Sequence, residues 1–248
     1  MTEPQTRGKT VKTAGNAAVA RVPQGHEQAL QLGVPNYMRV AEAIRHAVID
    51  GQFEDGQRLT TLELAKLYGL SLAPIREALN HLSAEGIVLL HPKRGAIVRS
   101  ISIDFLAEIY EVRLGLIPYL DGQRAGIATS ATVQELLAIE EHYEAAANRG
   151  DWPESIARNI ELHRTMLAIR PNQEAVQILA RHHGLLKALR NRYGFSLARP
   201  GQVIQEHRQL IDAFRRNDGD EAFKFSAIHL RNSCEELMAL IGSGTLSE

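Results

Sequence analysis

Hydrophobic positions in residues 58–99 follow a helical spacing first and then form two short apolar runs. The helical part predicts two helices that meet at Gly69, because glycine adopts the positive φ of a tight turn at little cost. Ser71 is a favourable N-cap for the second helix, and Pro74 falls in its first turn, where a missing N–H is tolerated. The inward positions are Leu62, Leu64, Ala65 and Leu67, then Ile75, Ala78, Leu79 and Leu82.

The two apolar runs, residues 87–90 and 96–98, flank a basic turn at residues 91–95. Strand, turn and strand in this order predict a small β wing. Together with a helix of about fourteen residues that begins at Asn36, they predict a winged helix-turn-helix domain, whose second helix enters the major groove of DNA. The residues expected to contact DNA are Ser71, Leu72, Ala73 and Arg76 on that helix and Lys93, Arg94 and Gly95 in the wing.

Residues beyond 101 carry long helical periods and no strand signal, so only helices are expected there. The first helix begins at Ser102 or Asp104. The other helices are expected to cover residues 132–148, 153–169, 173–193, 202–216 and 220–241, and residues 199–201 are expected to form a loop. Short connections between them favour an antiparallel bundle. The predicted fold class is therefore an all-α bundle with an N-terminal winged helix-turn-helix. The predicted organisation is a mobile tail (1–33), a DNA-binding domain (34–101), a helical effector domain (102–242) and a C-terminal tail (243–248).

Composition narrows the class of protein further. The chain has 248 residues, of which 44% are hydrophobic and 23% charged, as in ordinary globular proteins. No apolar run reaches the roughly 20 residues of a membrane-spanning helix, and Cys234 is the single cysteine, so we expect a cytoplasmic protein without disulfides. Residues 34–99 hold eight Lys and Arg against seven Asp and Glu. A domain with so little net charge depends on well-placed basic residues to bind DNA.

Histidines recur on three of the predicted bundle helices. Asn159 and His163 are four residues apart, hence on one face of their helix, while His207 and His229 each lie between inward apolar positions. Neutral imidazoles are common ligands of zinc, copper and nickel, and three of them with one oxygen leave positions open for an external ligand. Taken one by one, each histidine is also explained as a satisfied core or surface residue.

The winged region resembles the GntR family of bacterial transcription regulators. The resemblance rests on matches at fixed spacing, which include Gly56, Arg58, Leu59, Leu64, Ala65, Gly69, Leu70, Ser71, Pro74, Ile75, Arg76, Glu77, Ala78, Leu79, Glu85, Gly86, Arg94 and Gly95. Leu72 and Ala73 depart from it, because the family usually has arginine and threonine at these positions. The resemblance implies operator binding with altered base recognition.

The histidine pattern is similar to the FCD branch of that family. The branch binds a divalent metal with a D-x-x-F-H pair and two later histidines, which correspond here to Asn159, His163, His207 and His229. An amide thus stands where the family has a carboxylate. The resemblance implies a metal, most consistent with zinc, although nickel and manganese are possible, and it implies that Arg113 binds an effector carboxylate. Ile117 stands where the branch has glutamate.

The sequence therefore predicts a ligand-responsive transcription regulator, not an enzyme. We expect a homodimeric repressor that binds palindromic double-stranded operator DNA and responds to a small carboxylate. A metal-dependent hydrolase is an alternative, because zinc with an open position activates water. Against it, Glu161 should point away from the histidines, and no general base is evident. A metabolite-binding protein without operator recognition is a second alternative, suggested by Leu72 and Ala73. His46, His142, His182 and His183 are interpreted as surface residues.

Overall fold

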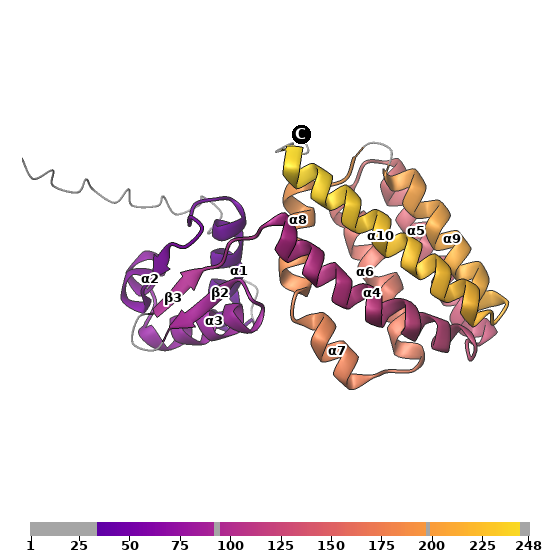
Figure 1. Ribbon diagram of the computed structural model, residues 1–248, viewed down its shortest axis with the longest axis horizontal. Helices are drawn as coiled ribbons and strands as arrows, with labels where there is room; N and C mark the ends of the chain where they lie inside the picture. Colours follow the sequence, from indigo (N-terminus) through magenta and orange to yellow (C-terminus); the bar gives the residue numbers. More distant parts are fainter. Residues whose placement is uncertain (1–33, 92–94, 197–198, 244–248) are drawn as a thin grey trace, which may run out of the picture.

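The computed structural model describes residues 34–91, 95–196 and 199–243. It has two parts: a small domain of helices with a three-stranded sheet, and a bundle of helices that begins after a short linker (Figure 1). The predicted fold class, an all-α bundle with an N-terminal winged helix-turn-helix, is confirmed. No helix in these residues is long and apolar enough to cross a membrane. The predicted tail at residues 1–33 lies outside the described residues.

The small domain contains α1 (Asn36–Ile49), β1 (Arg58–Leu59), α2 (Thr61–Tyr68), α3 (Leu72–Ala84), β2 (Val88–His91) and β3 (Gly95–Val98). A capping box starts α2, since the Thr60 side chain accepts from the Glu63 N–H and the Glu63 carboxylate accepts from the Thr60 N–H. Gly69 ends α2 at φ 65°, as expected for the turn. Leu62 is 58% exposed and so does not belong to the core, contrary to the sequence interpretation.

The sheet has the order β1-β3-β2, with antiparallel pairing throughout. β1 was not predicted, because two residues are too few to show a period. Gly95 has a φ of 82°, and a Cβ there would lie 2.7 Å from the Leu59 carbonyl oxygen, so the crossing of β1 and β3 requires glycine. The predicted contacts of Lys93 and Arg94 lie outside the described residues.

The bundle contains α4 (Ile103–Ala125), α5 (Ser130–Asn148), α6 (Trp152–Ile169), α7 (Gln173–Ala180), α8 (His183–Tyr193), α9 (Arg199–Arg215) and α10 (Gly219–Ser243). Ser102 caps α4 through a hydrogen bond from the Phe105 N–H. α4 and α10 are antiparallel along their length, since Gly122 lies against Gly219 at one end and Gly242 against Ile103 at the other. α10 runs to Ser243, which the sequence had assigned to the tail.

Two predicted features of the bundle are wrong. The single helix at residues 173–193 is divided at Arg181 and His182 into α7 and α8, because Leu185, Ala188 and Leu189 of α8 turn to pack into a core shared with the small domain. The predicted loop at residues 199–201 is the first turn of α9. Pro200 fits there because the first turn needs no N–H donor.

Candidate functional site

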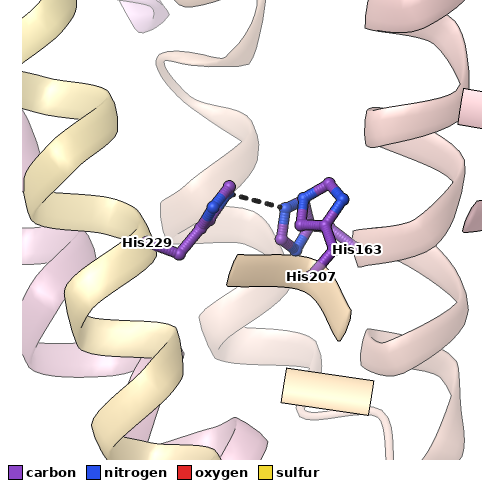
Figure 2. Close-up of side chains that lie close together, drawn as sticks. All are labelled: His163, His207 and His229. Carbon is purple, nitrogen blue, oxygen red and sulfur yellow. Dashed lines mark hydrogen bonds between the residues drawn. The ribbon is translucent and has the colours of Figure 1, made fainter. Parts of the chain in front are cut away.

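Three histidines meet inside the bundle. His163 comes from α6, His207 from α9 and His229 from α10, and one ring nitrogen of each lies within 4.8 Å of the others (Figure 2). The Nε2 atoms of His163 and His229 are 3.3 Å apart. The structure thus brings together three residues that the sequence selected from separate helices, and it orients their nitrogens toward one point, as a metal site requires.

Two glutamates hold the histidines from outside this cluster. The Oε2 of Glu140 lies 2.7 Å from the Nδ1 of His207, and the Oε2 of Glu206 lies 2.8 Å from the Nδ1 of His229. The Nε2 of His207 is buried and has no hydrogen-bond partner in the described structure. Hydrogen bonding at the second nitrogen fixes the ring orientation of metal-binding histidines. Both glutamates therefore leave Nε2 as the atom directed at the cluster.

Burial keeps the three imidazoles neutral. It lowers the pKa of His163 well below the usual value, with a further contribution from His229 and His207. It also lowers the pKa of His207 to about 3 and that of His229 to about 4. Only a neutral imidazole offers the lone pair that a metal ion needs. The cluster is therefore in the protonation state for metal binding at physiological pH.

The two glutamates differ in charge. Burial by itself would raise the pKa of Glu206, but hydrogen bonds from His229, Arg199 and Asn232 lower it to about 2, so Glu206 is ionised. An ionised carboxylate only accepts, hence the Nδ1 of His229 carries the proton and its Nε2 has a free lone pair. Burial and the nearby Glu144 raise the pKa of Glu140 to about 9. A cation at the cluster would favour the ionised form of Glu140.

Sequence reasoning missed both glutamates. Glu206 directly precedes His207 in the chain, yet it binds His229, which is 23 residues further on. Glu140 is 67 residues from His207 and has no spacing signal at all. The sequence also led us to expect that Glu161 points away from the histidines. The ion pair between the Glu161 carboxylate and Arg158 supports this expectation. Neither Glu140 nor Glu206 faces the cluster as a general base would, because each is bound to the outer ring nitrogen.

A cavity of about 480 Å³ opens beside the histidines. Arg113 of α4 and Asn159 of α6 line it together with His163 and His229. The Nε of Arg113 is buried and has no hydrogen-bond partner in the described residues. Burial lowers the pKa of Arg113, since it disfavours the charged guanidinium. Arg113 therefore lies at the wall of the cavity with a buried Nε that has no hydrogen-bond partner among the described residues, and it is not the solvated residue of the alternative interpretation.

The other histidines are distributed differently from the sequence interpretation. His142 is exposed as expected. His46 and His182 are half-buried, and His182 packs edge-on against Phe105. His183 is exposed at one side but also lines the cavity. His183 lines the cavity because the helix is divided at residues 181–182, which places the first turn of α8 beside the cavity.

The predicted DNA-binding face lies on α3. Ser71, Leu72, Ala73 and Arg76 are all exposed, and the N-cap position is occupied by Ser71, although its side chain makes no capping hydrogen bond. A shallow hollow runs between α3 and the wing, lined in part by Arg76, Asn80, His91 and Gly95. Arg76 has no salt bridge in the part of the chain that is described, so its guanidinium is available to another molecule.

Comparisons with known proteins agree with this arrangement. A family profile described as bacterial regulatory proteins, gntR family, matches residues 36–98, and the FCD domain profile matches residues 108–232. An uncharacterised HTH-type transcriptional regulator, YdhC of Bacillus subtilis, is 24% identical over 214 residues, which cover 85% of this chain and 94% of that protein. The gluconate operon transcriptional repressor of Bacillus subtilis is 30% identical over 130 residues, which cover 52% of this chain and 53% of that protein.

Solved structures show the same fold. Escherichia coli McbR/YncC has a TM-score of 0.62 at 20% identity, with 86% of this chain and 100% of that chain covered. A GntR regulator from Rhodococcus has a TM-score of 0.57 at 18% identity, with 82% of this chain and 97% of that chain covered. The matching proteins are transcription regulators, not enzymes. The chain therefore belongs to the GntR family of bacterial regulatory proteins and is a transcription regulator with an FCD effector domain.

Proposed function

We propose that this regulator is a homodimeric repressor that binds palindromic operator DNA and is released from it by a small carboxylate bound at a metal site in the bundle. The observation that carries the proposal is the meeting of three neutral histidines beside a cavity whose wall holds Arg113. Since bacterial operators are cytoplasmic, we place its action in the cytoplasm.

The residues present fit a divalent cation. His163, His207 and His229 would hold it, and the neutral amide oxygen of Asn159 is a candidate fourth ligand. The support is the Nε2 of His207, because leaving a buried polar atom without a partner costs about 1–3 kcal/mol unless a ligand is bound to it. Three imidazoles favour zinc, while nickel or manganese are the alternatives. When bound, the metal supplies positive charge and open coordination positions for an oxygen ligand.

A carboxylate suits the remaining features of the cavity. A guanidinium binds a carboxylate through two parallel hydrogen bonds, and the buried Nε of Arg113 has no other partner in the described structure. The volume of about 480 Å³ matches a small metabolite. Gluconate, which is part of the name of one similar repressor, is itself a small carboxylate.

The small domain is proposed to bind the operator through α3 and the wing. Ser71, Leu72, Ala73 and Arg76 would face the major groove, and Lys93, Arg94 and Gly95 would form the wing contact. A two-fold dimer places two such domains on a near-palindrome. Exposed apolar side chains on α4 and α10, Val112, Tyr119 and Phe223, are about half exposed and support pairing of two bundles.

The experiment combines metal content with DNA binding. Protein produced in its host would be assayed for bound metal and small molecules by native mass spectrometry, then for a gel shift of the DNA upstream of its own coding sequence. His207→Ala should lose the metal and the carboxylate response but retain DNA binding, whereas the exposed His142→Ala should behave as wild type. Full metal content in His207→Ala, or a response that survives chelation, would refute the metal-centred site. Absence of any DNA shift by wild-type protein would favour a metabolite-binding protein without operator recognition.

A further inference from the structure

The cavity has a basic side in addition to Arg113. Arg164 of α6 and His183 and Lys187 of α8 line it as well. Burial lowers the pKa of His183, and Arg113, Lys187, Arg164 and Arg45 lower it further in that order, so three cations of the cavity lining and one of α1 act on this imidazole. No salt bridge joins any of these four residues to a carboxylate within the described ranges. Four basic groups therefore line the cavity without a salt bridge in the described residues, and three of them, Arg164, His183 and Lys187, are at exposed positions.

The remaining charges at the cavity are already compensated. Arg199 makes two hydrogen bonds to Glu206, of 2.7 and 2.8 Å, and Arg190 pairs with Glu236. The one acidic residue in the described lining, Asp121, forms an ion pair with Arg124 at 3.4 Å and accepts a hydrogen bond of 2.7 Å from Ser226. A single carboxylate at Arg113 would leave the charges of Arg164 and Lys187 without a partner. The cavity consequently has a charge balance that favours a ligand with two negative groups.

We infer that Arg164, His183 and Lys187 form a second anion subsite, and that the effector carries two anionic groups, either two carboxylates or a carboxylate and a phosphate. This inference rests on the proposed function, in which the first anionic group binds at Arg113 and the histidine cluster. The second group lies toward α8 and α6, where its charge is shared between a guanidinium and an ammonium. Arginine and lysine are the side chains that bind carboxylate and phosphate groups.

The position of this subsite on α8 gives it a route to the DNA-binding domain. Gly184, next to His183, lies so close to α1 that a Cβ there would be 2.9 Å from the Nε of Arg45. Arg45 in turn binds Glu85, the C-cap residue of α3, with distances of 2.8 and 2.9 Å. A few residues further along α8, Arg192 donates to the Ile49 carbonyl and, at 2.9 Å, to the Asp50 carboxylate.

α8 therefore contacts the ligand cavity at His183 and Lys187 and contacts the small domain at Gly184 and Arg192. In the proposed site, a monoanion at Arg113 and the histidine cluster would not need to contact the basic side chains of α8. A dianion also engages α8, and hence the helix that reaches α1 and the end of α3. A ligand shifts a conformational equilibrium only through contacts that differ between the two states. The second anionic group would thus add the ligand contact that lies nearest to the DNA-binding domain.

The test is isothermal titration calorimetry of zinc-loaded, full-length protein, which measures the affinity for pairs of anions that have the same carbon chain length. The monoanions acetate, propionate, butyrate and valerate would be compared with the dianions malonate, succinate and glutarate, and with phosphoglycolate, whose phosphate adds about 1.5 to 2 negative charges to the carboxylate at pH 7. At least one dianion should bind more tightly than the monoanion of its length. Arg164→Gln and Lys187→Gln should each reduce that advantage roughly fivefold, the upper range for an exposed ion pair, and leave monoanion affinity unchanged. Lys224→Gln, an exposed lysine of α10 outside the cavity, should change neither affinity.

The outcomes separate the two proposals. Tighter binding of phosphoglycolate than of the dicarboxylates would identify a phosphate as the second group, and the reverse a carboxylate. The second subsite is refuted, while the carboxylate site stands, if no dianion binds more tightly than its matched monoanion. It is refuted likewise if the tighter binding of dianions survives in the Arg164→Gln, Lys187→Gln double variant and the circular dichroism spectrum of that variant is unchanged. If neither class of anion binds, the carboxylate site itself fails, and the subsite with it.

Discussion

The Oε2 of Glu140 lies 2.7 Å from the Nδ1 of His207, a histidine that is fully buried and whose Nε2 has no partner in the described structure. Glu140 belongs to α5, which contributes no histidine to the cluster. A fourth helix thus fixes the ring of one candidate metal ligand. The candidate site consequently depends on the packing of four helices, and a change at any of them should be measurable as metal affinity.

Glu140→Gln should lower metal affinity about 10-fold to 100-fold, the usual effect of removing the hydrogen-bond partner of a metal-binding histidine. The amide keeps the size of the side chain but removes the charge that the metal would favour. Competition with a coloured chelator measures the affinity. Glu141→Gln, at an exposed position next to Glu140 on α5, is the matched control and should change little. Equal affinities for both variants would show that Glu140 does not support the site.

Asn159→Asp should tighten metal binding, because it replaces a neutral amide oxygen with a charged oxygen ligand on the same face of α6 as His163. Asn159→Ala should weaken binding if the amide oxygen is a ligand. The same chelator competition measures both variants. An unchanged affinity in both would place Asn159 outside the coordination sphere and leave three histidines as the protein ligands.

Arg76→Ala should weaken operator binding by roughly 1–3 kcal/mol, the contribution of a good bidentate arginine contact. Its guanidinium is exposed on α3 and has no salt bridge in the described structure. Gel shifts at matched salt concentration measure the loss. Arg215→Ala removes an exposed arginine at the far end of α9 and should leave DNA affinity unchanged. Undiminished binding by Arg76→Ala would mean that this face of α3 does not contact DNA.

Leu72→Arg should strengthen DNA binding and alter the preferred site. Leu72 is 40% exposed at the start of α3, where a leucine can contact a thymine methyl group but donates no hydrogen bond. Selection of bound sequences from a random pool compares the two proteins. If both select the same sequence with the same affinity, position 72 does not face the groove.

Asp121→Asn should change how stability depends on pH. Burial raises the pKa of the Asp121 carboxyl to about 6, so between about 4 and 6 the folded protein binds a proton that the unfolded chain has released. The free energy of unfolding therefore loses about 3 kcal/mol from this group as the pH rises through that window. The variant lacks this loss, and its stability relative to wild type should increase by that amount between pH 4 and pH 7.

Urea unfolding of metal-free protein at several pH values measures this difference. The three buried histidines act with the opposite sign, since unfolding lets them bind protons at low pH, but they are common to both proteins and cancel in the comparison. The hydrogen bond from Ser226 and the ion pair with Arg124 both lower the pKa of Asp121, so their effects are already contained in the net value of about 6. A constant difference between the two proteins would show that Asp121 stays ionised in the folded state.

Local patterns in the sequence determined most of the small domain. The turn at Gly69 and the apolar positions of α3 are decided by residues within one or two turns of each other, so spacing alone identifies them. The same holds for the placement of His163, His207 and His229 on inward helix faces. Periodicity shows which face of a helix is buried and made these histidines candidates, while the resemblance to the FCD branch selected them as a set.

The tertiary structure decided which groups meet. Glu206 binds His229 instead of its neighbour His207, and Glu140 binds His207 across 67 residues, because the partner of a buried side chain depends on how separate helices pack. The division at residues 181–182 has the same cause, since α8 turns toward α1 and carries His183 to the cavity. The helical period is a property of neighbouring residues. The angle and register between two helices are set by side chains that are far apart in the chain, so the spacing of residues along one helix cannot predict them.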